Sequence, residues 1–212
     1  MRTLAPKKTP TPQRTLRRLY PLLRGRAAAL TCGVVSVALL HASACTGAVE
    51  WCERDPIALS AHDYRLLAVD EDPFYDASDA TITPCQAESD VRVETLGLEP
   101  SVTVETTSCN HATVMQRLPV LLHAGSRMHT RIWYYSQSSF EGAVAYVRLR
   151  FDDEDIVSRD VAIPSESALI SEDAVMPHEM PVGTPVSFHI GNHGDNSWNL
   201  LEVSLFPRAP CE

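Results

Sequence analysis

The chain has 212 residues, which is enough for one domain of ordinary size and an appendage. Its charge is segregated: residues 1–44 hold eight of the 18 Lys and Arg residues and none of the 27 acids, so the rest carries 10 bases against 27 acids, a formal charge of −17. Such an acidic body repels phosphate, which argues against nucleic acid as a partner and is compatible with solubility, cations or cationic partners.

Residues 1–44 have the three parts of a secretory signal peptide. Met1–Arg26 is basic and rich in Pro and Thr, Ala27–Leu40 is apolar, and His41–Ala44 ends in small residues. The apolar part is shorter than the roughly 20 residues that span a bilayer, so we expect export and cleavage, with a permanent membrane span as the alternative. The pair Arg17-Arg18 also leaves a twin-arginine signal open.

The residue after this segment, Cys45, is a candidate for lipidation. Residues 42–45 resemble a bacterial lipobox, in which the Cys is acylated and becomes the first residue, although Ala42 stands where Leu is usual. Removal of the signal takes Cys32 and leaves five cysteines, and acylation of Cys45 leaves an even four that can pair in an oxidising compartment. We therefore expect a lipid-anchored protein of the cell envelope, with residues 45–51 as the tether. Ordinary cleavage to a secreted soluble protein is the alternative.

Residues 52–212 predict one disulfide-stapled domain. Its start is ambiguous, since residues 56–69 could form a helical turn or an early strand, and the acidic residues 70–84 indicate a loop. Pro164–Pro185 contains four prolines and predicts a long connection. About eight strands separated by turns are typical of an all-β, antiparallel, jelly-roll-like sandwich. Alternating or β-branched runs that predict strands lie at 91–93, 102–104, 128–136, 143–151, 156–163, 186–190 and 199–206.

The cysteines of this domain are Cys52, Cys85, Cys109 and Cys211, and they allow three pairings. We favour Cys52–Cys85, which would close the N-terminal loop, together with Cys109–Cys211, which would tie down the C-terminus. Zinc ligation is the alternative, but the sequence has no close C-x₂-C pair among these cysteines.

The densest polar cluster is FHIGNHGDNSW at 188–198, between two expected strands, where sandwich domains carry binding loops. His189 and His193 could bind a metal such as copper, and carboxylate and amide oxygens could bind Ca²⁺. Trp198 could offer a flat apolar platform to a sugar ring. The alternative is a tight turn with Trp198 in the core. The oxygen ligands for Ca²⁺ would come from Asn192, Asp195 and Asn196. Apart from such a Ca²⁺ or Cu ion, the sequence indicates no cofactor.

A second candidate surface is one face of the strand expected at 128–136. Alternation places His129, Arg131, Trp133 and Tyr135 on one face and Met128, Thr130, Ile132 and Tyr134 on the other. Across an expected hairpin loop at 138–142, the next strand would add Tyr146, Arg148 and Arg150. Arginine and aromatic side chains on an exposed sheet can stack on sugars and bind carboxylates. The alternative is that Trp133 belongs to the core and the arginines pair with acids.

Parts of the chain resemble a known group of proteins. The run 108–116, the Trp133 strand and FHIGNHGDNSWNLLEVS at 188–204 are similar to exported bacterial lipoproteins whose C-terminal halves carry a Phe-His-x-x-Asn-His-Gly-x-Asn-x-Trp phrase. The similarity covers residues 108–206 and implies the extent of a β domain rather than an activity.

The sequence lacks a G-x-S-x-G elbow, an H-E-x-x-H motif and a phosphate-binding glycine loop, so an enzyme is the minority interpretation. The leading hypothesis is a surface-tethered lipoprotein whose β-sandwich, without catalysis, binds a carbohydrate or protein ligand through the 189–198 loop or the 129–135 face. One alternative is a metal-binding exported protein or metalloenzyme that uses His129, His189 and His193. Another is a purely structural envelope protein.

Overall fold

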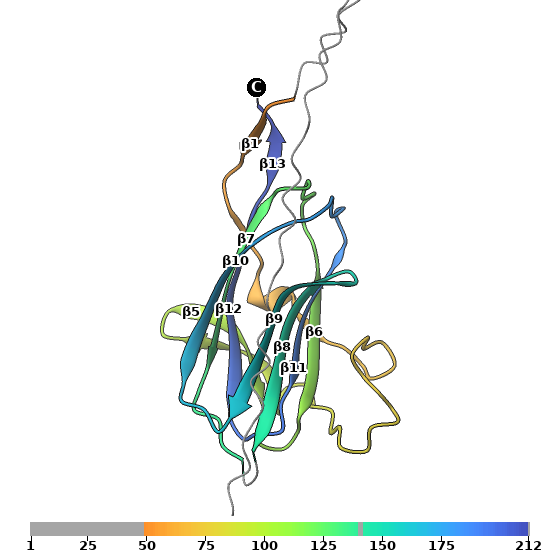
Figure 1. The fold of residues 1–212 in the computed structure, drawn as a ribbon, viewed down its shortest axis with the longest axis vertical. Coiled ribbons are helices and arrows are strands. Elements are labelled where there is room, and N and C mark those ends of the chain that lie inside the picture. The colour runs from red at the N-terminus through yellow and green to blue at the C-terminus, as the bar shows by residue number, and fades with distance from the viewer. Residues whose placement is uncertain (1–48, 140–141, 212) are drawn as a thin grey trace, which may run out of the picture. The chain divides into compact units, whose positions relative to one another are not determined.

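The computed structural model describes residues 49–139 and 142–211. Of the two units into which the chain divides, Met1–Thr46 therefore lies outside the described residues, as do the expected signal segment and Cys45. The described residues form 13 strands and one 3₁₀ turn, Ala61–Asp63, so the fold is all-β, antiparallel and sandwich-like (Figure 1), as the sequence predicts. Within the described ranges no helical segment is long and apolar enough to cross a membrane.

Two main sheets face each other (Figure 1). Sheet 1 has the order β10-β7-β12-β5-β4, and a short strand β2 also pairs with β12. Sheet 2 has the order β3-β6-β11-β8-β9. The strands of sheet 1 are β10 (Ala168–Val175), β7 (Arg127–Tyr134), β12 (Ser197–Phe206), β5 (Glu99–Glu105), β4 (Val91–Leu96) and β2 (Ile57–Ala58). Those of sheet 2 are β3 (Arg65–Leu66), β6 (His111–Arg117), β11 (Pro185–Gly191), β8 (Ala143–Phe151) and β9 (Glu154–Ile163).

The hydrophobic core lies between the two sheets and follows from the period-2 alternation of their strands. In β7, Met128, Thr130 and Ile132 are fully buried, while His129 and Arg131 between them are partly exposed. Sheet 2 contributes fully buried side chains such as Phe151 and Phe188. Trp198 of β12 is 0% exposed and packs on Tyr134, with 4.7 Å between ring centroids. Burial of such large apolar side chains is the main stabilising contribution to the fold.

The strands at 128–134 and 143–151 do not form the hairpin expected from the sequence. β7 pairs with β10 and β12 in sheet 1, whereas β8 pairs with β9 and β11 in sheet 2. The connection between them therefore crosses from one sheet to the other, and two of its residues, 140–141, lie outside the described ranges. Alternation predicts each strand and its faces but not the sheet that the strand joins.

The expected long connection at 164–185 contains a strand, β10, which pairs with β7 from Ala168 to Val175. All four prolines of that segment lie outside β10, so they bound the strand rather than break it. Every second residue of β10 is exposed, because alternate side chains point to the open outer face of sheet 1. The ambiguous segment 56–69 contains both expected elements, the short strands β2 and β3 and the 3₁₀ turn between them.

The expected disulfide pairing is wrong. The structure has Cys52–Cys211 and Cys85–Cys109, with sequence separations of 159 and 24. The strands β1 (Trp51–Glu53) and β13 (Arg208–Pro210) pair as a ribbon at one end of the sandwich (Figure 1), which brings the two ends of the domain together. Near β6, the bridge from Pro84 to His111 places Cys85 beside Cys109. Strand pairing between distant segments, which the sequence does not reveal, selects the partners.

Candidate functional site

The outer face of sheet 1 carries a groove of about 460 Å³, which we call the aromatic groove. It crosses the sheet from β10 through β7 and β12 to the β4–β5 hairpin. Its position on an exposed sheet face matches the second candidate surface of the sequence analysis. The lining residues are Leu96, Glu99, Arg131, Trp133, Tyr135, Leu169 and Leu201.

The alternation of β7 creates the apolar part of this groove. Met128, Thr130, Ile132 and Tyr134 point into the core, so Trp133 and the following Tyr135 lie on the outer face, as expected. Their rings are perpendicular, with centroids 6.1 Å apart, and Tyr135 remains 40% exposed. Leu169 of β10 is the direct cross-strand partner of Trp133. Leu201 occupies the register shift between Leu200 and Glu202, where a β-bulge re-aims a side chain.

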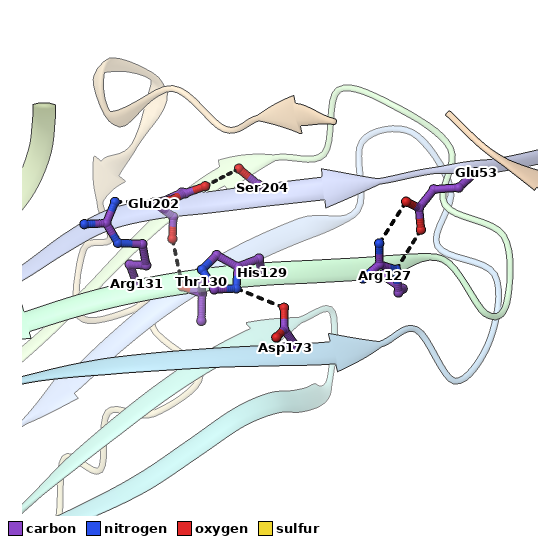
Figure 2. A network of polar contacts seen from close by, with 8 residues as sticks. All are labelled: Glu53, Arg127, His129, Thr130, Arg131, Asp173, Glu202 and Ser204. Carbon is purple, nitrogen blue, oxygen red and sulfur yellow. Dashed lines mark hydrogen bonds and ion pairs between the residues drawn. The ribbon is translucent and has the colours of Figure 1, made fainter. Parts of the chain in front are cut away.

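Charged groups flank the aromatic rings. The Arg131 guanidinium lies 3.2 Å from a Glu99 carboxylate oxygen and 3.4 Å from one of Glu202. The Ser204 hydroxyl donates to Glu202, and this bond, followed by Arg131, holds the pKa of the Glu202 carboxyl below its usual value (Figure 2). An arginine shared by two carboxylates, all partly exposed, offers both donors and acceptors beside the aromatic rings.

His129 lies on the same outer face but outside the groove lining. Its Nδ1 is 2.9 Å from Oδ1 of Asp173 on β10 (Figure 2). Further along β7, Arg127 donates to both carboxylate oxygens of Glu53, at 2.7 and 2.8 Å. These contacts tie the β1–β13 ribbon and the edge strand to β7, and they extend the polar end of the face.

The expected surface partner strand does not contribute to this face, because β8 belongs to sheet 2. Arg148 and Arg150 instead pair with acids of the β8–β9 hairpin. Arg148 lies 2.8 Å from Asp160, and Arg150 lies 2.7 Å from Asp155. Tyr146 is exposed on the outer face of sheet 2.

The polar loop between β11 and β12 uses most of its polar groups internally. Asn192 is fully buried, donates to Thr106 Oγ1 at 2.8 Å and to Gln137 Oε1 at 2.9 Å, and accepts from the backbone N–H of Gly194 at 3.0 Å. A Cβ at Gly194 would lie 2.9 Å from the Ser138 carbonyl oxygen, so only glycine fits there. These contacts make the loop a packed turn, and Asn192 is not available to a ligand.

The other residues proposed for this loop are also accounted for. Trp198, fully buried, cannot serve as a sugar platform, which corrects that expectation. Asn196 has a φ of 146° and donates to the Ser136 carbonyl at 2.6 Å. His193 Nδ1 lies 3.1 Å from the Asn110 amide nitrogen, and with Asp195 it lines a polar hollow of about 230 Å³. Two of the three proposed oxygen ligands for Ca²⁺, Asn192 and Asn196, therefore already have hydrogen-bond partners within the protein.

The expected metal set of His129, His189 and His193 is not brought together. His129 lies on the outer face of sheet 1, whereas His189 lies in β11 of sheet 2. The structure instead gathers Asp72, His111 and His189, whose ligand-forming atoms all lie within 4.8 Å of one another. We call these three residues the histidine cluster. No sequence pattern pointed to His111, and Asp72 stood out only as one of the acidic residues of the loop expected at 70–84.

The histidine cluster lies on the outer face of sheet 2, beneath the segment that connects β3 to β4. The His111 Nε2–H group donates to Asp72 Oδ2 at 2.9 Å, and Asp72 Oδ1 accepts from the backbone N–H of Phe74 at 2.9 Å. His189 Nδ1 lies 2.9 Å from Thr113 Oγ1, and the Phe74 ring stacks on His189 at 4.1 Å. Because β6 and β11 have the core on one face and this segment on the other, nearly all their residues are buried.

Burial controls protonation in the histidine cluster. It lowers the pKa of His189 to about 3, and the neighbouring His111 and then Arg148 and Arg150 add to this lowering against the opposing effect of Asp72. At Asp72, burial raises the pKa, but hydrogen bonds from His111, the Phe74 backbone and Thr113 outweigh it and lower the pKa overall. His189 is therefore neutral and Asp72 ionised at neutral pH.

No family model matches the sequence, and no curated protein matches it. Several solved structures have similar chain paths. A carbohydrate-binding module studied for specific mannan recognition is 9% identical, with a TM-score of 0.47 and coverage of 76% of this chain and 99% of that one. A family 35 carbohydrate-binding module from Clostridium thermocellum is 13% identical, with a TM-score of 0.35 and coverage of 73% and 99%.

A third similar structure is the K3 cleaved adhesin domain of Lys-gingipain from Porphyromonas gingivalis. It is 10% identical, with a TM-score of 0.41 and coverage of 73% of this chain and 98% of that one. Similarity at these levels does not identify what the present chain binds.

Proposed function

We propose that this chain is an exported, lipid-anchored protein that binds a carbohydrate, without catalysis, in the aromatic groove. The observation that carries the proposal is the position of Trp133 and Tyr135 in a shallow, accessible groove beside Arg131 and its two carboxylates. Sugars present apolar C–H faces next to hydroxyl groups. A surface with aromatic rings and a few well-placed polar groups complements both features.

The size of the groove favours a small ligand over a protein. Its volume of about 460 Å³ lies within the range of roughly 300–1,000 Å³ that is usual for small-molecule sites. A standard protein interface buries about 800 Å² on each partner, which requires a broad surface rather than a groove lined by a few side chains. The exposed ion pairs at its edge can exchange partners with hydroxyl groups at low cost, because such pairs contribute little on their own.

The cysteines support the lipid anchor. Cys52 pairs with Cys211 and Cys85 pairs with Cys109, so all four cysteines of the domain are used within it. Cys45 therefore has no partner among the cysteines of the domain, as acylation would require. Lipidation would hold the acidic sandwich at an envelope membrane with the aromatic groove free to capture glycans.

A glycan array with the full chain in detergent tests the groove. The probes are neutral and acidic oligosaccharides, and the variants are Trp133→Ala and Tyr135→Ala, with Trp51→Ala as a matched exposed aromatic outside the groove lining. We expect wild type and Trp51→Ala to bind the same glycans and the two groove variants to lose at least about tenfold in affinity, or 1.4 kcal/mol. Absence of any glycan bound by wild type, or unchanged binding by Trp133→Ala, contradicts the proposal.

Metabolic labelling tests the anchor separately. Cells that express wild type or Cys45→Ser are fed an alkyne analogue of palmitate, and the label on the protein is measured. We expect label on wild type and none on the variant. Equal labelling of both proteins would show that the anchor lies elsewhere, and absence of label on wild type would show that there is no acyl anchor.

A further inference from the structure

We propose that Asp72, His111 and His189 form a binding site for one divalent transition metal ion of the zinc or copper class. The site is independent of the aromatic groove and lies in the other sheet. It joins the segment after β3, the start of β6 and the end of β11, which are far apart in the sequence.

The spacing of the donor atoms suits a single ion. One ligand atom from each of the three residues lies within 4.8 Å of the other two. Ligand atoms on one tetrahedral zinc ion, with bonds of about 2.0–2.2 Å, lie roughly 3.4 Å apart. Side-chain movements of at most about 1.5 Å therefore bring all three atoms into bonding range.

Hydrogen bonds hold both imidazoles of the cluster in place. Each of the two imidazoles makes one hydrogen bond through one ring nitrogen, His111 to Asp72 and His189 to Thr113. Asp72 and His111 are already in direct contact, so an ion bound between them would replace the ring proton that now joins them.

An ion can reach the site and tolerate its surroundings. Asp72, His111 and Thr113 line a hollow of about 330 Å³ that opens to solvent, so water can enter and complete the coordination. The nearby guanidinium groups of Arg148 and Arg150 are both paired with acids of the β8–β9 hairpin, which limits their repulsion of a cation. The carboxylate of Asp72 supplies compensating negative charge directly at the ion.

The donor set indicates the class of metal. Two imidazoles and one carboxylate suit zinc, copper or nickel. Ca²⁺ takes six to eight oxygen ligands, and the cluster offers only the carboxylate of Asp72 and the hydroxyl of Thr113. We therefore expect tight binding of zinc or copper and no response to calcium.

Elemental analysis of the full, disulfide-bonded chain tests the proposal. The protein is stripped with a chelator, incubated with ZnCl₂, freed of excess metal and analysed, and Co²⁺ is added in parallel to read the visible absorption of a tetrahedral site. We expect one zinc per chain and a tetrahedral Co²⁺ spectrum. His189→Gln and Asp72→Asn, which keep volume and hydrogen-bonding capacity, should each lower zinc affinity by at least about tenfold, as removal of a direct ligand does.

The matched control is His129→Gln. His129 pairs with Asp173 on the outer face of sheet 1, away from the cluster, so this variant should still bind one zinc ion per chain. If both cluster variants unfold, zinc binding by wild type is followed instead through the rise in its midpoint of thermal unfolding and through Co²⁺ spectra in His111→Gln. Clearly substoichiometric zinc in wild type, or the same zinc affinity in wild type and all cluster variants, overturns the proposal. Glycan binding in the aromatic groove should be unaffected in every one of these variants.

Discussion

Two histidine–aspartate pairs of equal length lie on opposite outer faces of the sandwich. His111–Asp72 on sheet 2 and His129–Asp173 on sheet 1 both have a nitrogen–oxygen distance of 2.9 Å. The side chains of the first pair are 6% and 4% exposed, and those of the second are 27% and 78% exposed. The same two residue types thus form a buried, fixed pair in one place and a hydrated surface contact in the other.

The difference arises from what covers each sheet. The segment between β3 and β4 packs Phe74 and Tyr75 onto the rings of His189 and His111, which removes that face from water. None of the described segments covers the aromatic groove on the outer face of sheet 1 in this way, and Tyr135 and Leu169 remain exposed there. A covered polar cluster is suited to a fixed ligand such as an ion, whereas an open aromatic face is suited to a ligand that comes and goes.

Removal of the disulfides should have the largest effect on stability, and it should differ between the two regions. By loop-closure entropy, Cys52–Cys211 contributes about 5 kcal/mol and Cys85–Cys109 about 3 kcal/mol, since the loops contain 159 and 24 residues. Urea unfolding of Cys52→Ser/Cys211→Ser and Cys85→Ser/Cys109→Ser measures both. Zinc binding should weaken only in the second variant, because Cys85–Cys109 anchors the segment that covers the histidine cluster. A larger loss of stability in the second variant would contradict the ranking.

Substitution of Trp198 in β12 should lower stability, whereas substitution of Trp133 in β7 should lower glycan affinity. Trp198→Ala should cost about 3–5 kcal/mol of unfolding free energy, because it leaves a large cavity between the sheets. Trp133→Ala, on the outer face, should change stability by no more than about 1 kcal/mol while lowering glycan affinity by at least about tenfold. Chemical denaturation followed by circular dichroism compares them. Comparable losses from the two substitutions would mean that Trp133 belongs to the core.

Truncation of Asp72 should show the cost of breaking the buried pair. Asp72→Ala leaves the His111 ring N–H and the Phe74 backbone N–H without their acceptor. An orphaned buried donor costs about 1–3 kcal/mol, so we expect a loss of about 3 kcal/mol for the two together. Denaturant unfolding provides the measurement, and a loss below about 1 kcal/mol would show that water replaces the carboxylate.

The histidine cluster should also make stability depend on pH. The pKa of His189 is lowered to about 3 in the folded protein, while the unfolded chain retains the ordinary value near 6.5, so below that value the unfolded state binds protons first. Stability should therefore fall as the pH falls, by about 2 kcal/mol between neutral pH and roughly pH 5. The lowered pKa of Asp72 affects stability only near and below the ordinary aspartate pKa of 3.8, outside this window. Unfolding midpoints of metal-free wild type and His189→Gln across this range should diverge, and parallel curves would assign the pH dependence to other groups.

The alternation of apolar and polar residues predicts the strands and many of their faces, while long-range contacts decide how the strands are arranged. The faces of β7 were predictable because its residues alternate strictly, and Arg131, Trp133 and Tyr135 line the groove on the expected side. In β12 no residue is exposed, so alternation alone does not tell whether Trp198 faces the core or the outer side of the sheet. β11 alternates clearly between apolar and polar residues, but its polar residues Ser187 and His189 are also buried, so the alternation does not reveal the cover over that face.

The histidine cluster and the disulfides were not predictable for a related reason. Asp72 is 39 residues from His111, and Thr113 is 76 residues from His189, so no local spacing motif connects them. Their proximity depends on the pairing of β6 with β11 and on the path of the segment after β3. Cys52 and Cys211 meet only because β1 and β13 form a ribbon. Local sequence predicts strands and turns, but partners across sheets depend on the whole topology.

The exposed pair should show the smallest effect and set the lower limit of the comparison. Asp173→Ala removes the partner of His129 from the surface of β10, where water can solvate both groups. Exposed pairs contribute about 0–1 kcal/mol, so we expect a change below about 0.5 kcal/mol in the unfolding free energy, and zinc stoichiometry should be unchanged. Because the distance of this pair equals that of His111–Asp72, a small effect here beside a large one for Asp72→Ala would isolate burial, rather than geometry, as the cause. A loss from Asp173→Ala that matched the loss from Asp72→Ala would mean that the outer face of sheet 1 is also shielded from water.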